Sequence, residues 1–111
     1  MFKLIRDKIP EAMSEAGMHL DYASAQNDEF FKALLRGKLV EEVNEYLASR
    51  DSLEELVDIK TVIDYLISDR KEEFNQIYEQ KLKLRGGFDK KYIGFFPDAP
   101  TEGNTQTEME V

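Results

Sequence analysis

The sequence predicts an all-α fold, an antiparallel helical bundle with four main helices. Along most of the chain, apolar residues recur at spacings of three and four, as they do on one face of a helix, and strict alternation is scarce. Helix-capping signals separate these periodic segments from one another. A length of 111 residues is enough for a single domain with its own core.

The first two predicted helices are joined by a connector. Pro10 suits the first turn of a short helix, IPEAMSEA, because the fixed backbone angle of proline fits that position. The next segment, MHLDYASAQN, has no clear period and is predicted to be the connector. Asn27 or Asp28 can then cap a long helix that runs to about Arg50.

The third helix is predicted from a capping box. Ser52 and Glu55 have the spacing at which each side chain can bond a free backbone N–H at the helix start, and the helix should run to about Ser68. The connection from the second helix, at about Arg50, is very short. So short a turn favours an antiparallel hairpin in which the two helices pack on their apolar faces.

The fourth helix and the C-terminal segment complete the predicted organisation. Asp69 and Glu72 repeat the capping spacing, and the helix should continue until Gly86 and its glycine neighbour stop it. Residues 1–95 would form the domain. Residues 96–111 are acidic, polar and rich in turn-forming residues, so we expect a disordered tail there.

Charge and composition exclude several classes of function. The net charge of −8 argues against binding of a nucleic-acid polymer through a broad basic face. The N-terminus is too charged for a signal peptide, and no apolar stretch approaches the ~18 residues of a membrane span. The chain has no cysteine, which excludes thiol chemistry and disulfides. We therefore expect a soluble, cytoplasmic protein that binds neither nucleic acid nor a membrane.

Acidic residues interrupt the apolar face of the second predicted helix. Glu42 falls in a narrow stripe whose other members are Phe31, Leu35, Leu39 and Tyr46. Glu41 and Glu45 fall in the neighbouring stripe, so the three glutamates lie within an arc of roughly 100°. These carboxylates therefore lie at the edge of the predicted core.

Two more acids border the core on the third helix. Glu55 and Asp58 lie beside its apolar stripe, and an antiparallel hairpin would bring them toward the acids of the second helix at the turn end. Buried carboxylates that face one another cost several kcal/mol unless a cation joins them. Oxygen ligands select a hard ion, so the arrangement predicts bound Mg²⁺, with Mn²⁺ as second choice.

Each acid also has an ordinary structural interpretation. Lys38 could form helix-surface ion pairs with Glu41 or Glu42, and Glu55 serves a capping box. It is the convergence of the set that favours a metal. Other chemistries lack their residues, because His19 is the sole histidine and no glycine-rich segment completes a phosphate-binding loop.

The motifs resemble those of the all-α NTP pyrophosphatase superfamily, the MazG-like and phosphoribosyl-ATP pyrophosphohydrolase-like proteins. Its signature is E-E-x-x-E followed by E-x-x-D, which here reads EEVNE from Glu41 and ELVD from Glu55. KLIRDKIPE at 3–11 and LRGGFDKK at 84–91 resemble one branch of the superfamily. The resemblance implies Mg²⁺-dependent hydrolysis of nucleoside triphosphates to the monophosphate and pyrophosphate, which clears non-standard or excess nucleotides.

The same resemblance implies roles for individual residues. The Mg²⁺ ligands would be Glu42, Glu45, Glu55 and Asp58. Glu41 would orient or deprotonate the attacking water. The cations expected to hold the phosphates are Arg6, Lys8, Lys38 and Arg85, with Lys81 a weaker candidate.

The interval between Glu45 and Glu55 is shorter than in many members of the superfamily, which leaves the base specificity open. A non-catalytic helical module that binds a metal and a nucleotide is an alternative function, and a purely structural partner protein is another. Members of the superfamily usually build their sites within oligomers, and Phe30, Phe31 and Tyr46 would be exposed on an isolated hairpin. We therefore expect a homodimer or homotetramer.

Overall fold

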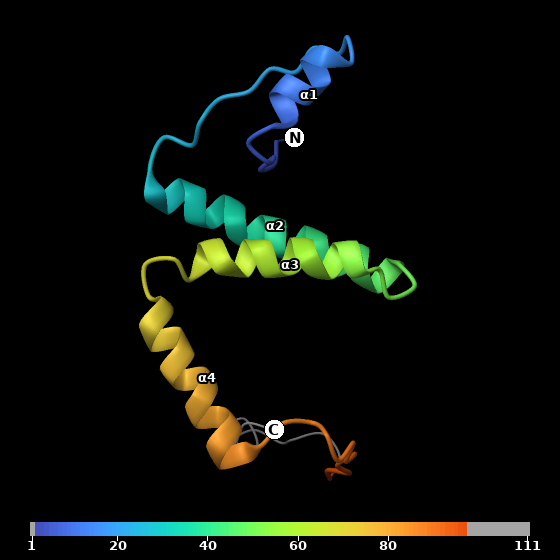
Figure 1. The fold of residues 1–111 in the computed structure, drawn as a ribbon, viewed down its shortest axis with the longest axis vertical. Coiled ribbons are helices and arrows are strands. Elements are labelled where there is room, and N and C mark those ends of the chain that lie inside the picture. The colour runs from blue at the N-terminus through green and yellow to red at the C-terminus, as the bar shows by residue number, and fades with distance from the viewer. Residues whose placement is uncertain (1, 98–111) are drawn as a thin grey trace. The chain divides into compact units, whose positions relative to one another are not determined.

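The computed structural model describes residues 2–97, and these residues form four helices and no strand. The helices are α1 (Ile9–Glu15), α2 (Asp28–Ala48), α3 (Leu53–Leu66) and α4 (Lys71–Arg85). Their order along the chain can be followed in Figure 1. The predicted all-α class and the four helices are confirmed. None of the helices within 2–97 is long and apolar enough to cross a membrane.

The chain divides into two compact units, Met1–Gln76 and Ile77–Val111. The first unit holds α1, α2, α3 and the start of α4, and the second holds the rest of α4 and the segment that follows it.

The short helix α1 begins as the sequence predicts. Pro10 lies in its first turn. The helix ends before Gly17, which has a φ of +79° that glycine adopts without strain. Residues 18–25 then form an irregular segment that leads to α2, which confirms the predicted connector.

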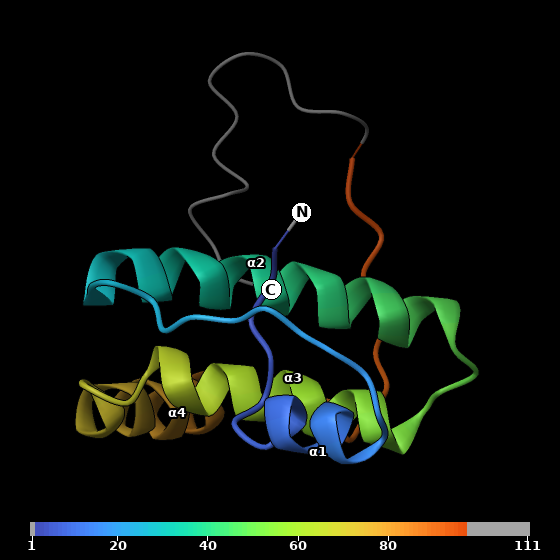
Figure 2. The ribbon, with the colours of Figure 1, turned by 90° about the horizontal axis from the view of Figure 1, so that it is seen from above.

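Helices α2 and α3 form an antiparallel pair, and Figures 1 and 2 both show them side by side. The side chain of Asn27 accepts a hydrogen bond of 2.8 Å from the Phe30 N–H and caps α2. The Ser52 hydroxyl accepts one of 3.4 Å from the Glu55 N–H and caps α3. These caps begin both helices at the predicted positions, and they set the hairpin of the first unit.

The turn between α2 and α3 is fixed by side-chain hydrogen bonds. The Ser49 hydroxyl donates to the Tyr46 carbonyl over 2.6 Å and accepts from the Ser52 N–H over 3.1 Å. The Tyr46 hydroxyl donates to the Asp51 carboxylate over 2.6 Å, and Asp51 adopts a positive φ of 60°. The turn is therefore tightly held, and it aligns the ends of the two helices that carry the acids.

The core of the described residues is small. Leu35 from α2 and Val62 from α3 are its buried apolar side chains. Glu42 is equally buried, with 4% of its surface exposed. The first unit thus places a carboxylate among its few buried side chains, which is costly without a compensating charge.

Helix α4 starts later than its capping signal indicates. The helix begins at Lys71, so the residue at the cap position is Arg70, and the prediction that Asp69 caps it is wrong. The Asp69 carboxylate instead lies 3.9 Å from Nε of Arg70. The helix ends at Arg85, and Gly86 follows with a φ of +79°, as predicted for a glycine stop. Most of the expected acidic tail, residues 98–111, lies outside the described residues.

Candidate functional site

Three carboxylates converge near the turn of the α2–α3 pair. Glu42 and Glu45 come from α2 and Glu55 comes from α3, and each offers one oxygen within 4.8 Å of the others. The i, i+3 spacing on α2 and the antiparallel register of α3 produce this cluster. We refer to Glu42, Glu45 and Glu55 as the carboxylate trio.

Two oxygens of the trio are buried without a hydrogen-bond partner. These atoms are Oε2 of Glu42 and Oε2 of Glu55. While both groups are ionised, neither can donate a proton to the other, and a buried oxygen without a donor costs about 1–3 kcal/mol. A cation between these atoms would remove that cost. The two oxygens are thus arranged as ligands for a hard metal ion.

The pKa of Glu55 is raised by burial and by the same closely spaced carboxylates. Burial of its carboxyl group, followed by proton sharing with Glu42 and the negative charges of Glu45 and Glu42, raises the pKa of Glu55 to about 7. In the absence of a metal, the trio therefore holds a proton near neutral pH. A divalent ion would displace that proton.

Glu41 lies beside the trio, and two lysines form ion pairs with its carboxylate. Oε1 of Glu41 is 2.9 Å from Nζ of Lys3, and Oε2 is 3.2 Å from Nζ of Lys38. The hydrogen bond from Lys3 and the charge of Lys38 lower the pKa of Glu41 despite its partial burial. Burial alone would lower the pKa of Lys38, but its bonds to Glu41 and Glu42 outweigh that effect and raise it. Both groups therefore stay charged at neutral pH.

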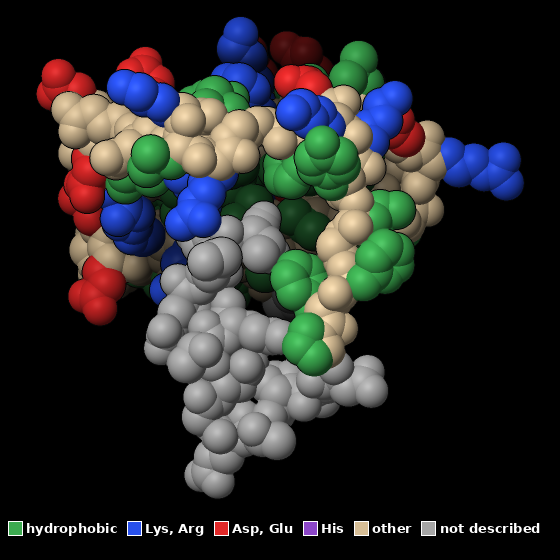
Figure 3. Space-filling view, turned by 90° about the horizontal axis from the view of Figure 1, so that it is seen from below, with side chains coloured by type: hydrophobic (Ala, Val, Ile, Leu, Met, Phe, Trp, Pro, Cys, Tyr) green, Lys and Arg blue, Asp and Glu red, His purple; other side chains and the backbone are tan. Residues whose placement is uncertain are grey.

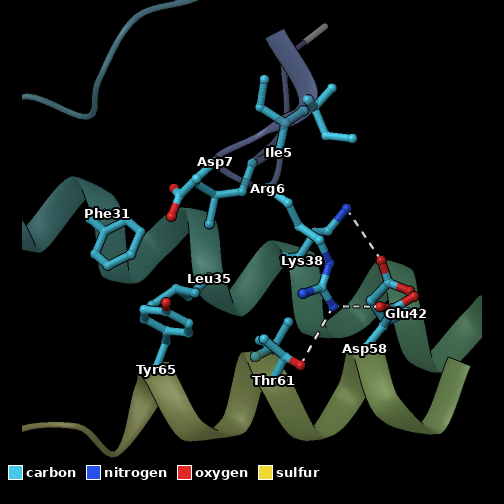
Figure 4. A pocket seen from close by; sticks show the side chains of 13 residues that line it. Ile5, Arg6, Asp7, Phe31, Leu35, Lys38, Glu42, Asp58, Thr61 and Tyr65 are labelled. Carbon is cyan, nitrogen blue, oxygen red and sulfur yellow. Dashed lines mark hydrogen bonds and ion pairs between the residues drawn. The ribbon is translucent and has the colours of Figure 1, made fainter. Parts of the chain in front are cut away.

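Asp58, the fourth predicted ligand, is paired with an arginine and does not belong to the trio. Nη2 of Arg6 lies 2.6 Å from Oδ1 of Asp58 and 3.5 Å from Oγ1 of Thr61. Figure 4 shows the Arg6 side chain reaching from the N-terminal segment toward these two residues of α3. The structure thus gives Asp58 a protein counter-ion of its own.

Glu42 and Asp58 border a pocket of about 510 Å³ between the N-terminal segment and the α2–α3 pair. Its charged lining residues are Arg6, Asp7, Lys38, Glu42 and Asp58. Its other lining residues are Leu4, Ile5, Ile9, Phe31, Leu35, Thr61, Val62 and Tyr65. In Figure 4, the rings of Phe31 and Tyr65 lie toward one end, with Asp7 near Phe31, and Glu42 and Asp58 lie toward the other end. The pocket therefore combines an apolar section with a charged one.

The predicted phosphate-binding residues are placed unequally. Arg6 and Lys38 line the pocket, whereas Lys8 is exposed and is not among its lining residues. Lys81 and Arg85 belong to the second unit, where both border a small depression of about 150 Å³ along α4. The first unit therefore brings Arg6 and Lys38 to the acids.

His19 pairs with Asp21 on the surface of the connector, 2.7 Å apart, as expected for a residue outside the site.

The sequence reasoning missed several residues of the site, chiefly Lys3, Thr61 and Tyr65. A signal for the last two was present, since Asp58, Thr61 and Tyr65 are spaced by three and four and share one face of α3. Nothing local marks Lys3 as the partner of Glu41, because that contact depends on how the N-terminal segment packs.

Comparison of the chain with protein-family models, curated proteins and solved structures gave no match. The chemistry of the site therefore has to be inferred from its residues.

Proposed function

We propose that the chain is a Mg²⁺-dependent nucleoside triphosphate pyrophosphohydrolase that releases the nucleoside monophosphate and pyrophosphate. The observation that carries this proposal is the carboxylate trio, with its two buried oxygens that lack a partner, at the edge of a pocket lined by Arg6 and Lys38. Acids that bind a hard cation next to bases that bind anions suit a metal–phosphate substrate. By its motifs, the enzyme would clear non-standard or excess nucleotides.

The residues of the trio fit Mg²⁺ well. All donors are carboxylate oxygens, and the absence of nitrogen and sulfur donors favours Mg²⁺ or Mn²⁺ over zinc. When bound, Mg²⁺ withdraws negative charge from phosphate oxygens and so favours attack by water on phosphorus.

The side chains around the trio have separable roles in this proposal. Arg6 and Lys38 hold the phosphate oxygens. Glu41 stays ionised because Lys3 and Lys38 lower its pKa, so it is suited to orienting the attacking water and is a weak base for deprotonating it. Phe31 and Tyr65 flank the apolar section of the pocket, which suits the nucleoside.

We also propose that the protein acts as a homodimer or homotetramer. Leu35 and Val62 are the buried apolar side chains among residues 2–97, whereas many large hydrophobic side chains are exposed. On α2 and α3 these include Val40, Leu47, Leu53 and Val57. Figure 3 shows exposed hydrophobic side chains on one face of the molecule. A second copy would cover such residues.

A chain without cysteine also suits a reducing, cytoplasmic location.

The proposal is tested by measuring pyrophosphate release from a panel of nucleoside and deoxynucleoside triphosphates, with Mg²⁺ or with EDTA. Turnover of at least one substrate with Mg²⁺ but not with EDTA is expected. Glu42→Gln and Asp58→Asn should abolish it while helix content stays the same. If no substrate is turned over at any metal concentration, the protein is not a pyrophosphohydrolase.

A non-catalytic module that binds a metal and a nucleotide is the second candidate. It is favoured by the ion pairs of Glu41, Glu42 and Asp58, because three of the five acids already have protein counter-ions. Calorimetry separates the two functions. Nucleotide binding without hydrolysis supports the module, and rapid turnover excludes it.

A further inference from the structure

The pair of Arg6 and Asp58 differs from the other ion pairs at the site. Its contacts to Asp58 and Thr61 all use Nη2 of the guanidinium. The Arg6 side chain is 57% exposed and the Asp58 side chain 34% exposed. An ion pair this exposed contributes little net stability, so it can be exchanged for another partner at low cost.

Lys38 is held more firmly than Arg6. Nζ of Lys38 lies 3.2 Å from both Glu41 and Glu42, and the Lys38 side chain is only 21% exposed. Lys3 contacts Glu41 alone, and neither Lys3 nor Glu41 lines the pocket. Arg6 is therefore the basic residue at the site that both lines the pocket and can leave its acid readily.

The acids at the site outnumber the bases that contact them. The acids are Glu41, Glu42, Glu45, Glu55 and Asp58, and the bases that contact them are Lys3, Arg6 and Lys38. The trio supplies three ligands, and Asp58 borders the same pocket as Glu42. For Oδ1 of Asp58 to become a fourth ligand, Arg6 has to leave that oxygen.

We propose that Arg6 is an exchangeable counter-ion that competes with the metal for Asp58. Without metal, Arg6 neutralises Asp58. When a divalent ion binds the trio, Asp58 turns to the ion and Arg6 is released into the pocket, where its guanidinium binds a phosphate of the substrate. This inference rests on the proposed metal site and phosphate substrate. It makes phosphate binding by Arg6 conditional on metal binding, so the metal binds first.

In this exchange, Arg6 weakens binding of the metal and strengthens binding of the phosphate ligand. Removal of Arg6 takes away a competitor of the metal, so the metal should bind more tightly. The same change removes a phosphate donor, so a phosphate ligand should bind more weakly. A purely structural role for Arg6, in which it only ties the N-terminal segment to α3, predicts weaker binding of both.

The test measures Mn²⁺ affinity by electron paramagnetic resonance for the wild type, Arg6→Gln, Asp58→Asn and the double variant. Lys3→Gln is the matched control, since it removes a positive charge from the site without touching Asp58. Arg6→Gln should tighten Mn²⁺ binding about fivefold, the upper range for loss of one exposed ion pair. Lys3→Gln should change it less than about twofold, the effect of a screened charge. When Asp58→Asn is already present, Arg6→Gln should change the Mn²⁺ affinity no more than Lys3→Gln does.

The second arm measures binding of inorganic pyrophosphate by calorimetry with saturating Mg²⁺. Arg6→Gln should weaken it about tenfold or more, and Lys3→Gln should not. Thermal unfolding of each variant shows whether the fold is kept. Equal effects of Arg6→Gln and Lys3→Gln on Mn²⁺, or weaker Mn²⁺ binding in Arg6→Gln, would overturn the exchange. Absence of turnover in the wild type would overturn the enzyme function but not these binding results.

Discussion

The carboxylates of Glu42 and Glu55 face each other across the α2–α3 pair, and each has a buried oxygen without a hydrogen-bond partner. Such a pair is unfavourable in a helical hairpin that serves only to fold. It is favourable once a divalent cation lies between the two side chains.

The stability of the metal-free protein should fall as pH rises toward neutral. The pKa of Glu55 is raised from 4.5 to about 7 in the folded chain, so the folded state holds a proton there that the unfolded state releases. The stabilisation is complete below about pH 4.5 and is lost as pH rises through about 7. Thermal unfolding in EDTA across this range measures the slope.

Glu55→Gln is the control for that slope, because it removes the titrating group while keeping the side-chain shape. Subtracting its profile from that of the wild type should isolate the loss between pH 4.5 and 7. If the two profiles run parallel, Glu55 is not the group responsible.

The small core should make single apolar truncations costly. Leu35→Ala should lower the free energy of unfolding by about 2–4 kcal/mol, because it opens a cavity at one of the few buried apolar positions. Leu47→Ala, at an exposed position on the same helix, should cost less than about 0.5 kcal/mol in the monomer. Urea unfolding of both variants measures the difference. Equal costs would contradict this assignment of the core.

The aromatic section of the pocket should contribute to nucleoside binding and not to phosphate binding. Tyr65→Ala should raise KM for the nucleoside triphosphate about tenfold, because ring stacking is worth about 1–3 kcal/mol per base. Binding of inorganic pyrophosphate should be unchanged. Tyr22→Ala, an exposed tyrosine of the connector, serves as the control. Equal losses for nucleotide and pyrophosphate would show that Tyr65 supports the pocket without contacting the base.

The helices and their hairpin could be predicted because their signals are local. Asn27 and Ser52 cap α2 and α3 as expected, and the short turn between the two helices set their antiparallel pairing. Asp69 shows the limit of such signals. The capping spacing is short enough to occur without a cap, and α4 begins one residue later than Asp69 would place it.

The counter-ions of the acids could not be predicted in the same way. Arg6 and Lys3 reach Asp58 and Glu41 across separations of 52 and 38 residues. These contacts depend on how the N-terminal segment packs over the α2–α3 pair, which no local pattern encodes. The sequence therefore indicated that the acids converge, but not that Asp58 would have an arginine partner.

The claim that the carboxylate trio is a metal site is tested most directly by Mg²⁺ titration of thermal stability at pH 8, where Glu55 is ionised. Wild-type Tm should rise saturably, by about 5 °C or more at tenfold the dissociation constant. Glu42→Gln should abolish the rise, whereas Glu54→Gln, which changes an exposed acid next to the trio, should keep it. A Tm that does not respond to Mg²⁺, or that responds equally in Glu42→Gln, would contradict the metal site.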